Sequence, residues 1–366
     1  PTIWLPFVFA GLMGVSILIY VILDGFDLGV GVLFPFAEED EKDRMIASIG
    51  PFWDANETWL VLGGGGLFAA FPLAYAIILP ATYPLIIAML LDAALGEPRW
   101  LWNRFPHPAV LMGRVIGWCD RRFNTGNQKQ VMGVLVLVGL CFAAGVIGWV
   151  IQLLPTNILD IAILAILLAQ KSLVEHVQAV GNALRLSLGD ARKGVAMIVG
   201  RDTRSMDGPA VARSAIESAA ENLSDGVIAP IFWFAVAGLP GLLIYKITNT
   251  ADSMIGYRTP KHAQFGWAAA RFDDLINLIP ARLTALMIWA VTTRPNPRPI
   301  LREAPLHRSP NAGWPEAAMA YGLGIALSGP RSYDGVLRDY PFVNGDGEHD
   351  LGAAHIDNAV NVLWKT

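Results

Sequence analysis

The sequence predicts an all-α protein that crosses a membrane several times. Of its 366 residues, 54% are hydrophobic and 16% are charged, whereas an ordinary soluble domain carries about 25% charged residues. Its mean hydropathy is +0.45. Several uncharged windows also reach the roughly 20 apolar residues that a helix needs to cross a bilayer. We therefore expect about five to seven membrane segments joined by cytoplasmic helical loops.

The apolar segments differ in strength. Three windows contain no charged residue, at 5–23, 60–91 and 131–154. Two weaker windows, 227–245 and 275–293, are interrupted by prolines and one arginine, and the apolar segment 157–170 is short. The basic connector between residues 99 and 129 predicts a cytoplasmic position for that loop, because Lys and Arg concentrate on the cytoplasmic side.

The segment 227–245 is predicted to be broken. Pro230 and the run Gly238-Leu-Pro-Gly241 interrupt it, and two half-length helices that meet at such a break line a cavity or form a re-entrant hairpin. A straight span would place the polar motifs before and after it on opposite faces of the membrane. A re-entrant hairpin keeps those motifs on one face, and an active site has to gather them.

Helical periodicity is also present in the polar parts of the chain. The stretches 171–188 and 210–223 repeat apolar residues at helical spacing, with a Gly- and Asp-rich turn region at 200–208 between them. If the segment 157–170 returns across the bilayer, this polar stretch is cytoplasmic too. The Pro- and Arg-rich tail after residue 294 predicts a cytoplasmic cap.

Several classes of function are excluded by what the sequence lacks. Two cysteines supply neither a disulfide framework nor a cysteine-built metal site. No basic stripe indicates nucleic-acid binding. There is no Gly-x-x-x-x-Gly-Lys-Ser/Thr loop, nucleophile elbow or zinc-protease helix motif, so any nucleotide is held without a P-loop.

The composition of the chain changes near Leu91, where apolar segments give way to a connector rich in arginine and proline. This change predicts two parts, residues 1–91 and 92–366. The first part carries Asp24-Gly-Phe-Asp-Leu-Gly29 and Trp53-Asp-Ala-Asn-Glu-Thr-Trp59 at the ends of its apolar segments. Carboxylates at a membrane boundary are functional candidates because burying them is costly. Asp24 and Asp54 are equally explained as caps of helix ends at the interface.

Together with Gly64-Gly-Gly-Leu-Phe-Ala-Ala-Phe-Pro72, these motifs resemble the opening of subunit II of the cytochrome bd-type quinol oxidases. The resemblance covers nearly all of residues 1–91 and nothing after Leu91. It implies that no haem ligands lie on this chain and that Asp24 and Asp54 belong to a proton path. It also implies oxidase subunit I as a partner if this part is functional.

The second part opens with a block that runs from Asp92 to Trp100 and continues through Pro106-His-Pro108 and Met112-Gly-Arg114. Prolines and glycine make rigid turns that would hold Asp92, His107 and Arg114 at a membrane surface. Interfacial anchoring by the tryptophans and arginines is the simpler alternative.

A second block places Glu217 and Glu221 four residues apart on one helix face, with Asn222 and Asp225 just beyond. Like charges at that spacing repel by a few tenths of a kcal/mol. A bridging divalent cation removes that cost, and oxygen-only ligands suit Mg²⁺. A solvated acidic face is the alternative, but the chain enters an apolar segment directly at Val227.

A third block, 249–277, sets charged residues of both signs between two apolar segments. Mixed signs fit a phosphate site in which Arg and Lys bind phosphate oxygens while carboxylates bind the metal. A structural ion-pair network is the alternative. The residues are Asn249, Asp252, Arg258, Lys261, Arg271, Asp273 and Asp274.

A fourth block is Ser309-Pro-Asn-Ala-Gly-Trp-Pro-Glu316. Proline followed by glutamate is a favourable helix start, so capping explains Glu316 without any further role.

All four blocks, with Gly200-Arg-Asp-Thr203, the helix at 171–184, Thr259-Pro-Lys261 and Phe265-Gly-Trp267, resemble the adenosylcobinamide-phosphate synthases of cobalamin biosynthesis. The resemblance runs from about residue 88 to the end. It implies an enzyme of the bacterial inner membrane with a cytoplasmic active site. That enzyme uses ATP to join adenosylcobyric acid to an aminopropanol phosphate through an amide.

On that resemblance, we expect Glu217, Glu221 and Asp225 to bind Mg²⁺, with Asp252, Asp273 and Asp274 as further catalytic carboxylates. The substrate- and phosphate-binding candidates are Arg114, Arg201, Asn222, Asn249, Arg258, Lys261, Arg271, His307 and Asn311. Two other hypotheses stay open: an electron-transport subunit carried by residues 1–91, and a fusion in which neither part is active. The apolar run 84–95 would serve both parts as a shared helix.

Overall fold

The structure is a computed structural model that describes residues 4–33, 39–49, 53–333 and 336–366. Its contacts divide the chain into two units, Pro1–Tyr83 and Pro84–Thr366. The side chains of Asp24 and Asp54, the predicted proton-path residues, lie outside the described part of the structure.

The described residues of the first unit form helices. Gly63 and Gly66 allow two of them, α1 and α3, to approach closely, because a Cβ atom at either position would lie only 3.1 Å from Ile17 or 3.2 Å from Met13. The helices of this unit are α1 (Leu5–Leu33), α2 (Glu39–Ile49), α3 (Trp53–Ala70) and the beginning of α4 (Pro72–Leu95).

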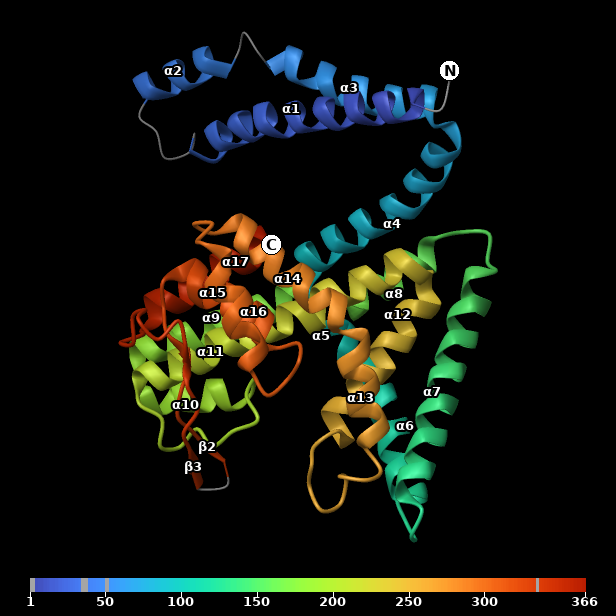
Figure 1. The fold of residues 1–366 in the computed structure, drawn as a ribbon, viewed down its shortest axis with the longest axis vertical. Coiled ribbons are helices and arrows are strands. Elements are labelled where there is room, and N and C mark those ends of the chain that lie inside the picture. Colours follow the sequence, from blue (N-terminus) through green and yellow to red (C-terminus); the bar gives the residue numbers. More distant parts are fainter. Residues whose placement is uncertain (1–3, 34–38, 50–52, 334–335) are drawn as a thin grey trace. The chain divides into compact units, whose positions relative to one another are not determined.

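The second unit contains an apolar bundle centred on α12, which packs along α7 and contacts α6, α8 and α13 (Figure 1). Leu164, Leu239 and Leu242 are fully buried in its core. The bundle helices are α6 (Pro108–Phe123), α7 (Lys129–Gln152), α8 (Ile158–Leu167), α12 (Ala229–Ile255) and α13 (Trp267–Ile276), preceded by the short α5 (Arg99–Trp102).

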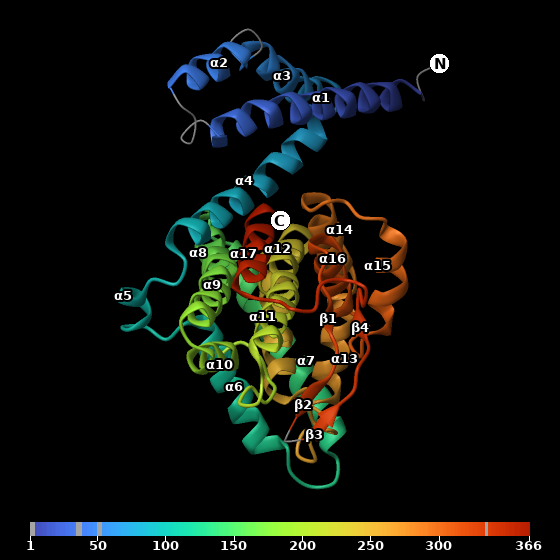
Figure 2. The same ribbon diagram turned by 90° about the vertical axis from the view of Figure 1, so that its left-hand side faces the viewer.

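A second core of this unit joins α9, α11 and α17, which lie side by side (Figure 2). Val177, Ile216 and Ile356 are fully buried within it. Its elements are α9 (Gln170–Leu186), α10 (Leu188–Ala196), α11 (Gly208–Leu223), α14 (Leu278–Val291), α16 (Gly313–Leu323) and α17 (Ala353–Lys365). The two helices predicted at 171–188 and 210–223 are thus confirmed as α9 and α11.

The break predicted in segment 227–245 is confirmed. Helix α12 loses helical geometry at Ala237 and Gly238, where Gly238 has φ of 62°, and Pro240 follows. The positive φ favours glycine, because a Cβ atom strains that backbone. Just upstream, Ser224–Ile228 forms a single π-helical turn, η2, that joins α11 to α12.

The prediction of an all-α membrane protein is confirmed. Within the described residues, three helices are long and apolar enough to cross a membrane, or four if the pair α13 and α14, bent by 46°, is one span. Fewer helices are long and apolar enough for a membrane span than the sequence has apolar segments. One reason is that α8 has 10 residues, a length of about 15 Å. The window 60–91 extends over parts of both α3 and α4.

The tail after residue 294 forms more than the predicted cap. After α15 (Pro297–Glu303), the 3-10 turn η3 (Ala304–Leu306) and α16, the chain makes two small antiparallel pairs. Strand β1 (Leu327–Ser328) pairs with β4 (Phe342–Val343), and β2 (Arg331–Tyr333) pairs with β3 (Val336–Arg338). These two pairs form a β-ribbon, and its first strand, β1, contacts helix α11.

Candidate active site

The continuous run α11–η2–α12 carries the acidic residues at the centre of the candidate site. Regular helical turns bring Glu217 and Glu221 near one another, and the π turn then carries Asp225. Single π turns are frequent at functional sites. Two groups of polar side chains meet along this run. The basic group consists of Arg201, Arg308 and Arg331. The acidic group consists of Asp225, Asp252 and Asp273.

Glu217 organises the basic group. It is 1% exposed. Its Oε2 accepts from Arg201 at 2.5 Å and lies 3.2 Å from the Arg331 guanidinium. Its Oε1 accepts from the Ser328 backbone N–H at 2.7 Å. Both oxygens of Glu217 are therefore engaged, and a buried charge of this kind is tolerated because it is fully paired.

Glu221, one helical turn further, lies between the two groups. It interacts electrostatically with Arg308, Arg201 and Arg331 on the basic side. It also interacts with Asp225 and Asp252 on the acidic side. Unlike Glu217, it is exposed, so it is accessible to a ligand.

The acidic group collects carboxylates from three helices. Asp225 of η2 lies within electrostatic range of Asp252 of α12 and Asp273 of α13. Asn249 Nδ2 donates to Asp273 Oδ1 at 3.3 Å, and Asn277 Nδ2 donates to Asp273 Oδ2 at 3.0 Å. The amides thus orient Asp273, while Asp225 and Asp252 remain close to it as like charges.

The structure limits how many of the predicted carboxylates can bind one Mg²⁺ ion. Among the residues that the structure describes, no group of three or more His, Cys, Asp or Glu side chains is close enough to hold a metal ion. The predicted set of Glu217, Glu221 and Asp225 therefore does not converge on one point here. Carboxylate and amide oxygens are nevertheless the donors that Mg²⁺ prefers, and it usually needs only one or two protein carboxylates beside substrate phosphates.

His307 and Glu316 form a buried pair beside Glu217, with His307 Nε2 3.8 Å from Glu316 Oε1. Burial and the nearby Arg331 charge lower the pKa of His307 to about 4. Burial and the charges of Glu217 and Glu221 raise the pKa of Glu316 well above its ordinary value. Both shifts favour the uncharged form of the side chain, which suits a site that already holds many charges.

Asn311 connects the fourth sequence block to the acidic group. Its Nδ2 donates to the Asp274 backbone carbonyl at 2.7 Å, and its buried Oδ1 has no hydrogen-bond partner in the structure. The exposed Arg271 lies 3.9 Å from Asp274, and Arg258 also interacts with that carboxylate. These four predicted residues therefore lie together at one edge of the site.

Among the interactions that the structure describes, three predicted residues make none with the basic or the acidic group. Arg114 is exposed on α6, and the Asn222 amide donates to the Ser218 carbonyl at 2.8 Å. Lys261 pairs with Asp120 at 2.6 Å. Burial raises the pKa of Asp120, but hydrogen bonds from Lys261, Asn124 and His262 outweigh burial and lower it. Lys261 thus fastens the 256–266 loop to α6.

The first block holds structural contacts. Asp92 Oδ2 accepts from the backbone N–H of Gln170 at 3.1 Å and of Lys171 at 3.3 Å, at the start of α9. His107 Nδ1 accepts from Ala109 N at 3.2 Å and caps α6.

Sequence reasoning missed four residues of the site. Arg331, Ser328 and Arg308 come from segments without a helical pattern, so nothing local marked them. Glu316 was assigned to a helix start, and it does lie in the first turn of α16, but its side chain makes no cap hydrogen bond and is 2% exposed. An acidic residue in an otherwise apolar helix was the available signal.

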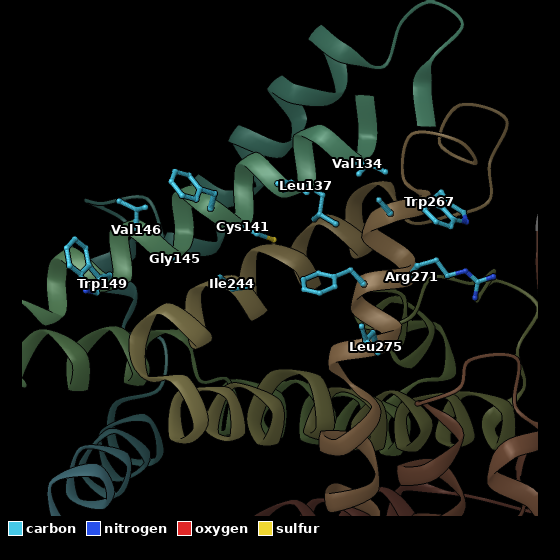
Figure 3. A pocket seen from close by; sticks show the side chains of 14 residues that line it. Val134, Leu137, Cys141, Gly145, Val146, Trp149, Ile244, Trp267, Arg271 and Leu275 are labelled. Atoms are coloured by element: carbon cyan, nitrogen blue, oxygen red, sulfur yellow. The ribbon is translucent and has the colours of Figure 1, made fainter. Parts of the chain in front are cut away.

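A separate apolar groove lies between α7, α12 and α13, with a volume of about 850 Å³ (Figure 3). Leu137 and Phe142 of α7 and Phe272 of α13 are among its lining residues, and Arg271 is the one charged residue among the lining residues described. The groove contains no carboxylate, so the polar chemistry belongs to the α11–η2–α12 site.

Fold and site together define a helical membrane protein with a buried arginine–carboxylate site. The chain belongs to the CobD/Cbib protein family, whose sequence model matches residues 85–363. Residues 5–96 match the model of cytochrome bd terminal oxidase subunit II. Both resemblances seen in the sequence are thereby confirmed, and the matches overlap in α4.

Proteins called "Cobalamin biosynthesis protein CobD" are similar to most of this chain. The one from Rhizobium meliloti (strain 1021) is 47% identical over 299 residues, which is 76% of this chain and 91% of the relative. That of Brucella anthropi is 46% identical over 301 residues, covering 77% and 92%. That of Rhodobacter capsulatus is 46% identical over 271 residues, covering 71% and 86%. No solved structure matches the chain.

Proposed function

We propose that this chain acts in cobalamin biosynthesis as an ATP-dependent amide ligase that joins adenosylcobyric acid to aminopropanol phosphate. The observation that carries the proposal is the meeting of arginines and carboxylates around Glu221, in a chain of the CobD/Cbib family. Arginines suit phosphate oxygens because their planar fork matches them.

The chemistry follows from the substrates. A propionate carboxylate does not accept an amine unaided, so ATP transfers its γ-phosphoryl group to that carboxylate and ADP leaves. The amine then attacks the acyl carbon: the C–N bond forms, the acyl C–O bond breaks, the nitrogen loses a proton, and inorganic phosphate leaves. Arg201, Arg308 and Arg331 would stabilise the phosphate charge in both steps.

Mg²⁺ fits the acidic group in this proposal. Asp225 and Asp252 would hold it together with phosphate oxygens, and it would supply charge neutralisation of the triphosphate. Glu217 has a different role, because its oxygens are engaged by Arg201, Arg331 and Ser328. It would fix the two arginines. We place the site on the cytoplasmic face of a bacterial inner membrane.

The direct test uses the purified full chain in detergent with adenosylcobyric acid, aminopropanol phosphate, ATP and Mg²⁺. The expected result is adenosylcobinamide phosphate, identified by mass, with one ADP released per amide formed. Omission of ATP is the matched control and should abolish the product. A folded chain that releases neither ADP nor product from these substrates would contradict the proposal.

A second candidate function concerns residues 5–96, which match an oxidase subunit II model. On that hypothesis this unit binds an oxidase subunit I and no haem is carried by this chain. Co-expression with subunit I tests it: stable co-purification would support the hypothesis, and separate elution of the two chains would oppose it.

A further inference from the structure

A small cavity adjoins the candidate active site on the side of the β-ribbon. It has a volume of about 390 Å³ and lies between α15, η3 and the chain from Ser328 to Val343. Pockets of this size accept small molecules. Arg302, Arg308 and Arg331 line it, against one carboxylate, Glu303, among the lining residues that the structure describes. Its basic balance favours an anion.

Arg331 is built into the wall of this cavity. Its side chain is 7% exposed, its guanidinium lies 3.2 Å from Glu217 Oε2, and it donates to Ser328 Oγ at 2.8 Å. Two anchors fix the plane of a guanidinium, and a fixed plane gives phosphate recognition a defined direction. Arg331 also belongs to the basic group of the active site, so the two spaces share a wall.

Arg308 supplies the second link. It is exposed, and it interacts electrostatically with Glu221, with His307 and with Tyr340. Since Tyr340 lines the cavity and Glu221 lies at the centre of the active site, Arg308 stands between them. An anion held there would reach toward the carboxylates.

Part of the cavity wall is apolar. Leu306, Phe342 and Val343 line it. The Phe342 ring is fixed by an edge contact with His349, at 4.6 Å between centroids, and by the Arg213 guanidinium 5.1 Å away. Gly329, with φ of 82°, lets the ring lie where a Cβ atom would be only 2.3 Å away. This wall offers an apolar surface against which the organic part of a ligand can pack.

We propose that this cavity is the binding site for an organic phosphate, with its phosphate on Arg308 and Arg331 and its organic part against Leu306 and Phe342. The identity of the ligand rests on the proposed function, which has two such substrates, a nucleoside triphosphate and an aminoalkyl phosphate. The shared chemistry is a phosphate joined to a small organic group.

The test measures equilibrium binding to the full chain in detergent without turnover. A non-hydrolysable ATP analogue and aminopropanol phosphate are titrated separately into the wild type, Arg308→Ala and Arg298→Ala. Arg298 is the matched control, because it is an exposed arginine of α15 that does not line the cavity. We expect Arg308→Ala to weaken one ligand about tenfold or more and Arg298→Ala to change Kd less than about twofold.

The ligand that loses affinity identifies the occupant. If Arg308→Ala does not fold, Arg302→Ala and Arg308→Lys are used: loss of the neighbouring arginine, or of the planar fork alone, should still weaken the same ligand. Unchanged Kd for both ligands in the folded variants would overturn the site. Arg308-dependent binding without any ligation would instead contradict the proposed function, while ligation with unchanged Kd would contradict only the cavity.

Discussion

Two glutamates on one helix illustrate how burial decides a side chain's role. Glu217 and Glu221 are one turn apart on α11, and the sequence predicts the same metal-binding role for both. The structure surrounds Glu217 with Arg201, Arg331 and the Ser328 N–H, and leaves Glu221 exposed. The first is thus a structural anchor of the site and the second is accessible to substrate.

This difference predicts opposite phenotypes. Glu217→Ala leaves buried guanidinium charge without its carboxylate, so we expect a loss of about 3–5 kcal/mol in stability. Glu221→Ala removes an exposed carboxylate and should change stability by less than about 1 kcal/mol while lowering ligation. Thermal unfolding in detergent, measured beside ligation rates, checks both. Equal loss of stability in the two variants would contradict the assignment.

The pair His307 and Glu316 predicts a pH dependence with two signs. The pKa of His307 is lowered to about 4 from 6.5, so its stabilising contribution is present above pH 6.5 and is lost as pH falls toward 4. The pKa of Glu316 is raised from 4.5, so its contribution is present below pH 4.5 and is lost as pH rises through the folded value. The two effects oppose one another between pH 4.5 and 6.5.

Single variants separate these effects. His307→Gln should flatten the fall of stability below pH 6.5, where the histidine contributes up to roughly 1.4 kcal/mol per pH unit. Glu316→Gln should make the folded protein less sensitive to rising pH. Unfolding midpoints from pH 4.5 to 8 measure both slopes. Parallel pH profiles for His307→Gln and the wild type would show that the histidine is not buried in its neutral form.

At the scale of elements, the long helices were predictable and the ribbon was not. Apolar periodicity located α9 and α11, and Pro and Gly residues located the break in α12. Strands β1 and β4 have two residues each, too few for an alternating pattern to be recognised. Because that ribbon delivers Ser328 and Arg331, no local pattern marked these two residues in the sequence.

Gly148 lets α7 pack closely on the broken helix α12. A Cβ atom at Gly148 would lie 2.6 Å from the backbone nitrogen of Pro240, just after the break. Gly148→Ala should therefore destabilise the protein by about 1–3 kcal/mol. Gly139→Ala on the same helix is the control, because nothing lies within 4 Å of its Cβ position, and it should be neutral or slightly stabilising. Unfolding temperatures of the two variants would show the contrast, and similar values would refute this packing.

At the scale of the molecule, two family matches share one helix. The CobD/Cbib match begins at residue 85 and the oxidase-type match ends at residue 96, so both include the second half of α4. The sequence predicts a join near Leu91 inside the apolar run 84–95, and the contacts divide the chain at Tyr83 and Pro84. We expect this shared helix to let either part insert with its neighbouring segment intact.

The two hydrophobic cores described for the second unit contain residues from Leu85 onward only, and the residues of the candidate site all lie after residue 200. Deletion of residues 1–83 therefore removes no side chain from either core or from the site. We expect the chain 84–366 to insert into membranes and to keep its ligation rate within about twofold, since independent parts contribute additively. Ligation assays on equal amounts of the two purified chains test this expectation. A truncated chain that folds, binds substrate and fails to turn over would show that the oxidase-type unit takes part in the reaction.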